Sequence, residues 1–81
     1  MGIWIRRQDK SALINANKIN IADFHDLFKN AIWGDDVFLG EYSTKEKALK
    51  VLDEIQEFIV YYENISNMVY QMPQDDIVET D

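Results

Sequence analysis

Few residues of this chain have the types and spacings that catalysis or metal binding needs. The one histidine lies in Asp23-Phe24-His25-Asp26, which offers a nitrogen and two carboxylates to a metal ion. Short acidic segments of this kind are usually solvated turns, so we expect no metal site. Asp35 and Asp36 follow Gly34 in a hairpin-turn pattern, where water would keep both carboxyls ionised.

Nucleophilic and phosphate-binding motifs are also missing from the sequence. Cysteine is absent, and the glycines at 2, 34 and 40 form no phosphate-binding loop. The serines have no histidine near them in sequence, and Ser43 is expected to cap a helix. The sequence therefore predicts a non-enzymatic protein without a cofactor.

A basic segment near the start of the chain is a candidate anion or ligand site, formed by Trp4, Arg6, Arg7 and Lys10. Strand alternation places Trp4 and Arg6 on one face, so a nucleotide base could stack beside a guanidinium group that binds its phosphate. The alternative is that these cations balance the surplus acid of the same chain.

Apolar residues outside the expected core are candidate partner contacts. Leu49, Val60 and Tyr61 fall outside the core-facing arc of a predicted helix, and Trp33 and Phe38 are expected on an uncovered sheet face. Several exposed apolar side chains together are typical of an association surface. A protein partner and a homodimer both remain open.

The acidic residues form a third candidate surface. Eight Lys and Arg against fifteen Asp and Glu give a net charge of −7, which disfavours binding to nucleic acid or anionic lipid. The acidic face comprises Asp53, Glu54, Glu57, Asp75 and Asp76. Such a face could imitate a row of phosphates and inhibit a nucleic-acid or defence enzyme, although a solvated helix face explains the same residues.

The elements that must position these residues follow from periodicity. Alternating apolar residues and turn signals predict strands at 3–7, 12–15, 19–21, 37–42 and 68–72. Residues 23–33 fit a short helix or a strand, and the turn after Trp33 favours a strand at about 28–33.

The clearest element is a helix from Thr44 to about Asn64, with Ser43 and Glu46 as a capping box. Its apolar stripe is Ala48, Val51, Leu52, Ile55, Phe58, Ile59 and Tyr62. The expected fold is α+β, with a small antiparallel sheet of four to six short strands and one long helix across one face, in the order β-β-β-β-β-α-β.

With 81 residues, 47% of them hydrophobic, the chain predicts a single domain over 1–73 and a flexible acidic tail over 74–81. The longest apolar run, residues 58–62, is far shorter than a membrane span. The apolar residues at the start precede the positive charges, the reverse of a secretory signal, so we expect a cytoplasmic protein.

Five segments carry a resemblance to a known family: 4–10, 13–15, 39–49, 51–55 and the Met-Pro pair at 72–73. Together, in this order, they resemble a family of short uncharacterised proteins of low-GC Gram-positive bacteria and their prophages. The resemblance implies a bacterial or phage cytoplasmic setting and transfers no site residue. The leading hypothesis is thus an accessory protein that acts through protein–protein contacts, with acidic mimicry and nucleotide binding as the alternatives.

Overall fold

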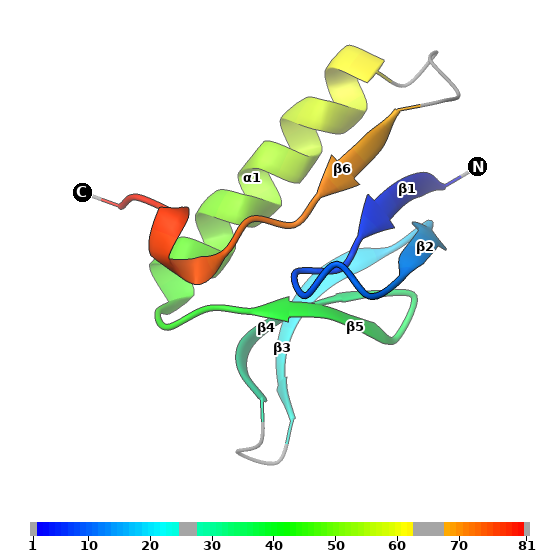
Figure 1. Cartoon of the computed structure of the whole chain (residues 1–81). Helices are drawn as coiled ribbons and strands as arrows, with labels where there is room; N and C mark the ends of the chain where they lie inside the picture. Colours follow the sequence, from blue (N-terminus) through cyan, green and yellow to red (C-terminus); the bar gives the residue numbers. More distant parts are fainter. Residues whose placement is uncertain (1, 25–27, 63–67, 81) are drawn as a thin grey trace.

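In the part of the chain that the structure describes, six strands and one long helix follow one another in the order that the sequence predicts. The structure is a computed structural model and describes residues 2–24, 28–62 and 68–80. The elements are β1 (Ile3–Arg6), β2 (Leu13–Ala16), β3 (Ile19–Phe24), β4 (Phe28–Gly34), β5 (Val37–Glu41), α1 (Lys45–Tyr62), β6 (Val69–Gln71) and the 3-10 turn η1 (Asp75–Ile77) (Figure 1). The predicted α+β class and element order are confirmed.

The strands form two three-stranded sheets, where the sequence predicts one. The first has the order β2-β1-β6 and the second the order β3-β4-β5. β1 pairs antiparallel with β2 and parallel with β6, with Ile5 opposite Ile14 and Tyr70. The long connection through α1 permits this parallel pairing, because it returns the chain to its first strand in the same direction. The first sheet, β2-β1-β6, is therefore mixed, whereas the sequence predicts a purely antiparallel one.

The β4–β5 hairpin turn lies where the sequence predicts it, although its glycine has another role. Asp35 and Asp36 have φ values of 49° and 69°, which a type I′ turn requires of its two central residues. Gly34 has no positive φ; a Cβ there would lie 3.0 Å from side-chain carbons of both Ala16 and Leu39. The missing side chain at Gly34 therefore leaves room for the close approach of the two sheets at this point.

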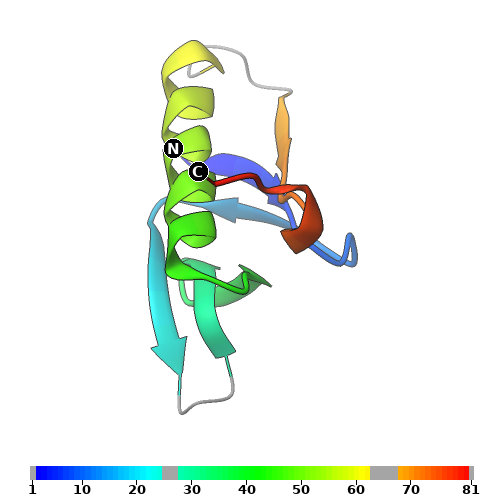
Figure 2. The same cartoon turned by 90° about the vertical axis from the view of Figure 1, so that its left-hand side faces the viewer.

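The 23–33 segment, open between helix and strand in the sequence, is extended in its described part. β3 pairs antiparallel with β4, with Ile21 opposite Ile32, and residues 25–27 lie outside the described residues. Figure 2 shows that this hairpin extends past the first turn of α1.

The core lies between α1 and the inner faces of both sheets. Its largest fully buried side chains are Ile5, Ile32, Leu39, Val51, Ile55 and Met72. α1 packs against β3 and β4, and Phe58 of α1 makes an edge-to-face contact with Tyr70 of β6 at 5.5 Å. Within the predicted apolar stripe of the helix, the last turns differ from expectation, because Ile59 and Tyr62 remain 37% and 39% exposed.

The start of the helix is one residue later than predicted. The Thr44 hydroxyl accepts a hydrogen bond from the Lys47 amide at 3.1 Å, so Thr44 is the N-cap and Lys47 the third helical residue. The predicted Ser43–Glu46 capping box is therefore replaced by a Thr44 cap. The Ser43 amide donates instead to the Asp75 carboxylate, at 2.7 Å.

Residues 74–80 are packed against the domain, in contrast to the flexible tail expected from their composition. Val78 is only 7% exposed and belongs to the core, and Met72, just before this segment, is fully buried. Lys47 donates to the Asp75 carbonyl at 3.0 Å, and Lys50 donates to the Glu79 carbonyl. The acidic composition of residues 74–81 does not reveal that Val78 is buried or that the carbonyls of Asp75 and Glu79 bind lysines of α1. The domain therefore extends beyond residue 73.

Candidate protein-binding groove

An open groove of about 430 Å³ separates α1 from the first three strands. Its strand wall consists of Gly2, Ile3, Ala16, Asn17 and Ile19, and its helix wall of Leu52, Ile55, Gln56, Ile59 and Val60. Eight of these ten residues are apolar and none carries a charge. The volume lies within the range of sites that bind organic groups, roughly 300–1,000 Å³, so the groove can hold several apolar side chains.

The groove exists because the helix continues beyond the surface that the strands can cover. Ile55 is fully buried, whereas Ile59, one turn later, is 37% exposed and Val60 is 65% exposed. The core face of the helix therefore turns gradually into an open wall. Asn17 helps to fix the opposite wall, because its backbone N–H donates a hydrogen bond to the Asp35 carboxylate at 3.0 Å.

Of the predicted partner contacts on the helix, Leu49 and Val60 share a face. They are eleven residues apart, and three turns of 3.6 residues bring them back to nearly the same direction. Val60 lines the groove, and Leu49 is 44% exposed. Tyr61 is 77% exposed and lies about 100° further around the helix from Val60, so the structure separates it from this wall.

Trp33 and Phe38 lie on the second sheet and form a pair of their own. Their ring centroids are 5.6 Å apart in an edge-to-face arrangement, and both side chains are half-buried. The Trp33 indole donates to the Ala22 carbonyl at 3.0 Å, and the Arg7 guanidinium lies 5.6 Å from the Phe38 ring centroid. This face is thus partly covered by Arg7, where the sequence predicts an uncovered surface.

The four residues of the predicted anion site do not converge. Trp4 and Arg6 are exposed on the outer face of the first sheet, and the Arg6 Nε donates to the Lys10 carbonyl at 3.1 Å. Arg7 lies against Phe38 of the other sheet and pairs with Asp9 at 3.7 Å. Arg6 therefore contacts Lys10 and shares a face with Trp4, while Arg7 has a packing role.

The acidic face is also divided. Asp53 and Glu57 are exposed on α1, whereas Glu54 accepts a hydrogen bond from the Tyr70 hydroxyl at 3.2 Å. Asp75 binds the Ser43 amide and lies 3.6 Å from the Lys47 ammonium, while Asp76 is exposed on η1. The backbone N–H of Ser43 holds the pKa of the Asp75 carboxyl below its usual value, and Lys47 adds to this effect.

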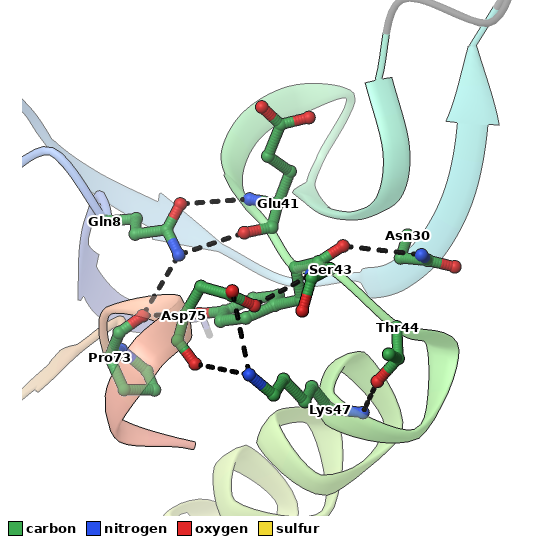
Figure 3. Close-up of polar contacts among 9 residues, drawn as sticks. Gln8, Asn30, Glu41, Ser43, Thr44, Lys47, Pro73 and Asp75 are labelled. Atoms are coloured by element: carbon green, nitrogen blue, oxygen red, sulfur yellow. Dashed lines mark hydrogen bonds and ion pairs between the residues drawn. The ribbon is translucent and has the colours of Figure 1, made fainter. Parts of the chain in front are cut away.

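A second polar cluster joins three distant segments around Gln8 (Figure 3). The Gln8 amide nitrogen donates to the Glu41 and Pro73 carbonyls at 3.0 and 3.2 Å, and its oxygen accepts from the Glu41 amide at 3.1 Å. The Tyr42 hydroxyl donates to the Pro73 carbonyl at 2.8 Å. Burial raises the pKa of Tyr42 above its ordinary value, so this hydroxyl stays neutral and donates. These groups are paired with one another, which makes the cluster structural.

The described residues bring no metal-binding cluster together. In residues 2–24, 28–62 and 68–80 no group of three or more metal-ligating side chains is found, and no polar or charged residue is fully buried. Asp23 accepts a hydrogen bond from the Asn30 amide at 2.8 Å, while His25 and Asp26 lie outside the described residues. Across the same part of the chain, no helix has the length and apolarity that crossing a membrane would require.

Comparisons with protein families, with curated proteins and with solved structures find no match to this chain. The groove is therefore interpreted from its own geometry. Sequence reasoning missed its strand wall, because Ile3 and Ile19 have the alternation of ordinary core residues. The helix sequence nevertheless carried a signal, because Leu49 and Val60 are apolar residues that lie outside the core-facing stripe.

Proposed function

We propose that this chain is a non-enzymatic protein-binding domain whose groove receives apolar side chains of a partner protein. One observation carries the proposal: the groove of about 430 Å³ is lined mostly by apolar residues, and it is open along α1. Removing a concave apolar surface of this kind from water lowers the free energy, so its burial by a partner favours binding.

The placement of side chains supports binding over catalysis. The polar residues nearest the groove are the neutral amides of Asn17 and Gln56, which can orient a partner by hydrogen bonds but cannot exchange protons near neutral pH. The carboxylates with shifted pKa values, Asp9, Asp35 and Asp75, all bind backbone amides within the domain. Their shifts therefore have a structural cause.

The alternatives have less support from the geometry. A nucleotide site would need Arg7 beside Trp4 and Arg6, and Arg7 packs on the other sheet. An acidic mimic would need a continuous row of free carboxylates, and Asp75 is bound to Ser43 and Lys47. We further propose, on the sequence resemblance alone, that the protein acts in the cytoplasm of a Gram-positive bacterium or its prophage.

The proposal is tested by affinity capture from a Gram-positive lysate with the wild type, Val60→Asp and Tyr61→Asp. Both substituted residues are highly exposed near the end of the same helix, and only Val60 lines the groove. We expect a partner that wild type and Tyr61→Asp retain and that Val60→Asp loses by at least about tenfold, because a buried carboxylate is costly. Equal retention by both variants would contradict a groove-mediated interaction.

A further inference from the structure

The helix wall of the groove belongs to a largely apolar stripe on α1 that overlaps one edge of the core-facing stripe and shares Leu52 and Ile59 with it. The stripe consists of Leu49, Leu52, Gln56, Ile59 and Val60. Successive members are three, four, three and one residues apart, which keeps them on one side of a helix with 3.6 residues per turn. Four of the five line the groove, and Leu49 continues the stripe toward the start of α1. A helix with an open stripe of this spacing is suited to packing against another helix.

The outer border of this stripe is acidic. Asp53 lies one turn after Leu49 and Glu57 one turn after Asp53, and both side chains are exposed. None of the groove residues carries a charge, and the chain as a whole carries −7. The exposed carboxylates of Asp53 and Glu57 therefore favour a partner with positive charges beside its apolar residues.

The same charges disfavour a second copy of this chain as the occupant. A two-fold antiparallel pairing of the stripes would bring Asp53 and Glu57 of each copy beside the acidic border of the other. Like charges at such a seam are repulsive, and two copies would each contribute −7 of net charge.

We infer that the groove binds a basic amphipathic helix of a partner protein, with apolar residues at i, i+3 or i+4, and i+7 and with Lys or Arg along the edge that faces Asp53 and Glu57. This inference rests on the proposed function and adds the chemistry of the partner to it. Lys18, next to Asn17 of the strand wall, is exposed at the opposite side. The positive residues of the partner therefore belong on the edge that faces Asp53 and Glu57, and not on the edge that faces Lys18.

A synthetic helix tests the inference directly. The probe is a peptide of about 18 residues, long enough to span the helix wall, with a leucine stripe, lysine and arginine along one edge and alanine elsewhere. One comparison peptide has glutamate in place of each basic residue, and another has the composition of the probe in an order without a stripe. Binding is measured by fluorescence anisotropy and mapped by NMR chemical shifts.

We expect the basic peptide to bind at least about tenfold more tightly than either comparison peptide, with weaker binding at higher salt. The shifted resonances should include Ile3, Ala16, Gln56 and Val60. The variant Asp53→Lys/Glu57→Lys should weaken binding of the basic peptide by about tenfold. The control Asp76→Lys/Glu79→Lys makes the same change in net charge on the C-terminal segment and should alter affinity by less than about threefold.

The outcomes separate the inference from the proposed function. Equal binding of the basic and glutamate peptides, or equal loss in both double variants, would overturn the basic partner. No binding of any peptide, while Val60→Asp still loses its partner in lysate capture, would overturn the helical partner and leave the groove as the site. Retention of all captured partners by Val60→Asp would overturn the proposed function itself. Thermal melts of each variant confirm that the compared proteins are folded.

Discussion

The Asp75 carboxylate lies 2.7 Å from the backbone nitrogen of Ser43, a residue 32 positions earlier in the chain, and accepts its hydrogen bond. Ser43 directly precedes the N-cap of α1, so a side chain from the C-terminal segment binds the start of the helix. The negative charge of the carboxylate also interacts favourably with the positive end of the helix dipole. The helix start and the C-terminal segment therefore stabilise each other.

Replacing Asp75 by asparagine should destabilise the domain. The amide oxygen can still accept from Ser43, but the bond loses its charge and the Lys47 ion pair, 3.6 Å long, is lost. Because the side chain is partly exposed, we expect a loss of about 1 kcal/mol in the free energy of unfolding. Urea denaturation measures this loss. Asp76→Asn, an exposed neighbour, is the control and should change stability by less than about 0.5 kcal/mol.

Acid should weaken the domain through the same carboxylate and two others. Hydrogen bonds from backbone or hydroxyl groups lower the pKa of Asp9, Asp35 and Asp75 below the ordinary value of 3.8. A lowered pKa in the folded state means that the unfolded chain binds protons first as the pH falls. The contribution of these three carboxylates to stability is therefore complete above their ordinary pKa and is lost as the pH falls below it.

Thermal melts between about pH 7 and pH 2 measure this loss. Asp75→Asn should flatten the acid limb of the curve, since one of the shifted groups no longer titrates. An unchanged acid limb in this variant would contradict the role given to the Asp75 carboxylate.

Changing Gln8 to glutamate tests the cluster in Figure 3 with almost no change in shape. A carboxylate can still accept from the Glu41 amide, but it cannot donate to the Glu41 and Pro73 carbonyls and would repel them. We expect a loss of about 1–3 kcal/mol in unfolding free energy. Stability equal to that of wild type in urea would show that these bonds contribute little.

The packing of residues 72–78 predicts unequal effects of two substitutions. Met72 is fully buried, so Met72→Ala should cost about 2–5 kcal/mol. Ile77 is 65% exposed, and Ile77→Ala should cost less than about 0.5 kcal/mol. Differential scanning calorimetry distinguishes the two. Similar small effects at both positions would contradict the burial of this segment.

The order of strands and helix was predictable because each element has its own local pattern. The alternation of Ile19 and Ile21 and the unbroken apolar stripe of α1 depend only on neighbouring residues. The division into two sheets was not predictable in this way. The contacts that hold the two sheets together are remote in sequence: Gly34 lies close to Ala16, and Gln8 binds the Glu41 and Pro73 carbonyls. None of these contacts has a local signature.

Of the helix wall of the groove, the sequence singled out Val60 as a site residue, and it did not predict the strand wall. Leu49 and Val60 stood out because they lie off the core-facing arc of the helix. Ile3 and Ile19 have the pattern of core residues, and their position beside an open groove follows from where the sheets end relative to α1. Asp75 was assigned to a flexible tail because a local acidic composition does not reveal a hydrogen-bond partner 32 residues away.

The parallel pairing of β1 with β6 has a consequence for folding during synthesis. Trp4, Ile5 and Arg6 are synthesised before the helix, and their partners Val69, Tyr70 and Gln71 only after it. The second sheet can form earlier from consecutive hairpins, since its contacts are short-range in sequence. One edge of β1 therefore stays exposed until β6 has been synthesised, and during this interval the nascent chain is open to capture by chaperones or to aggregation.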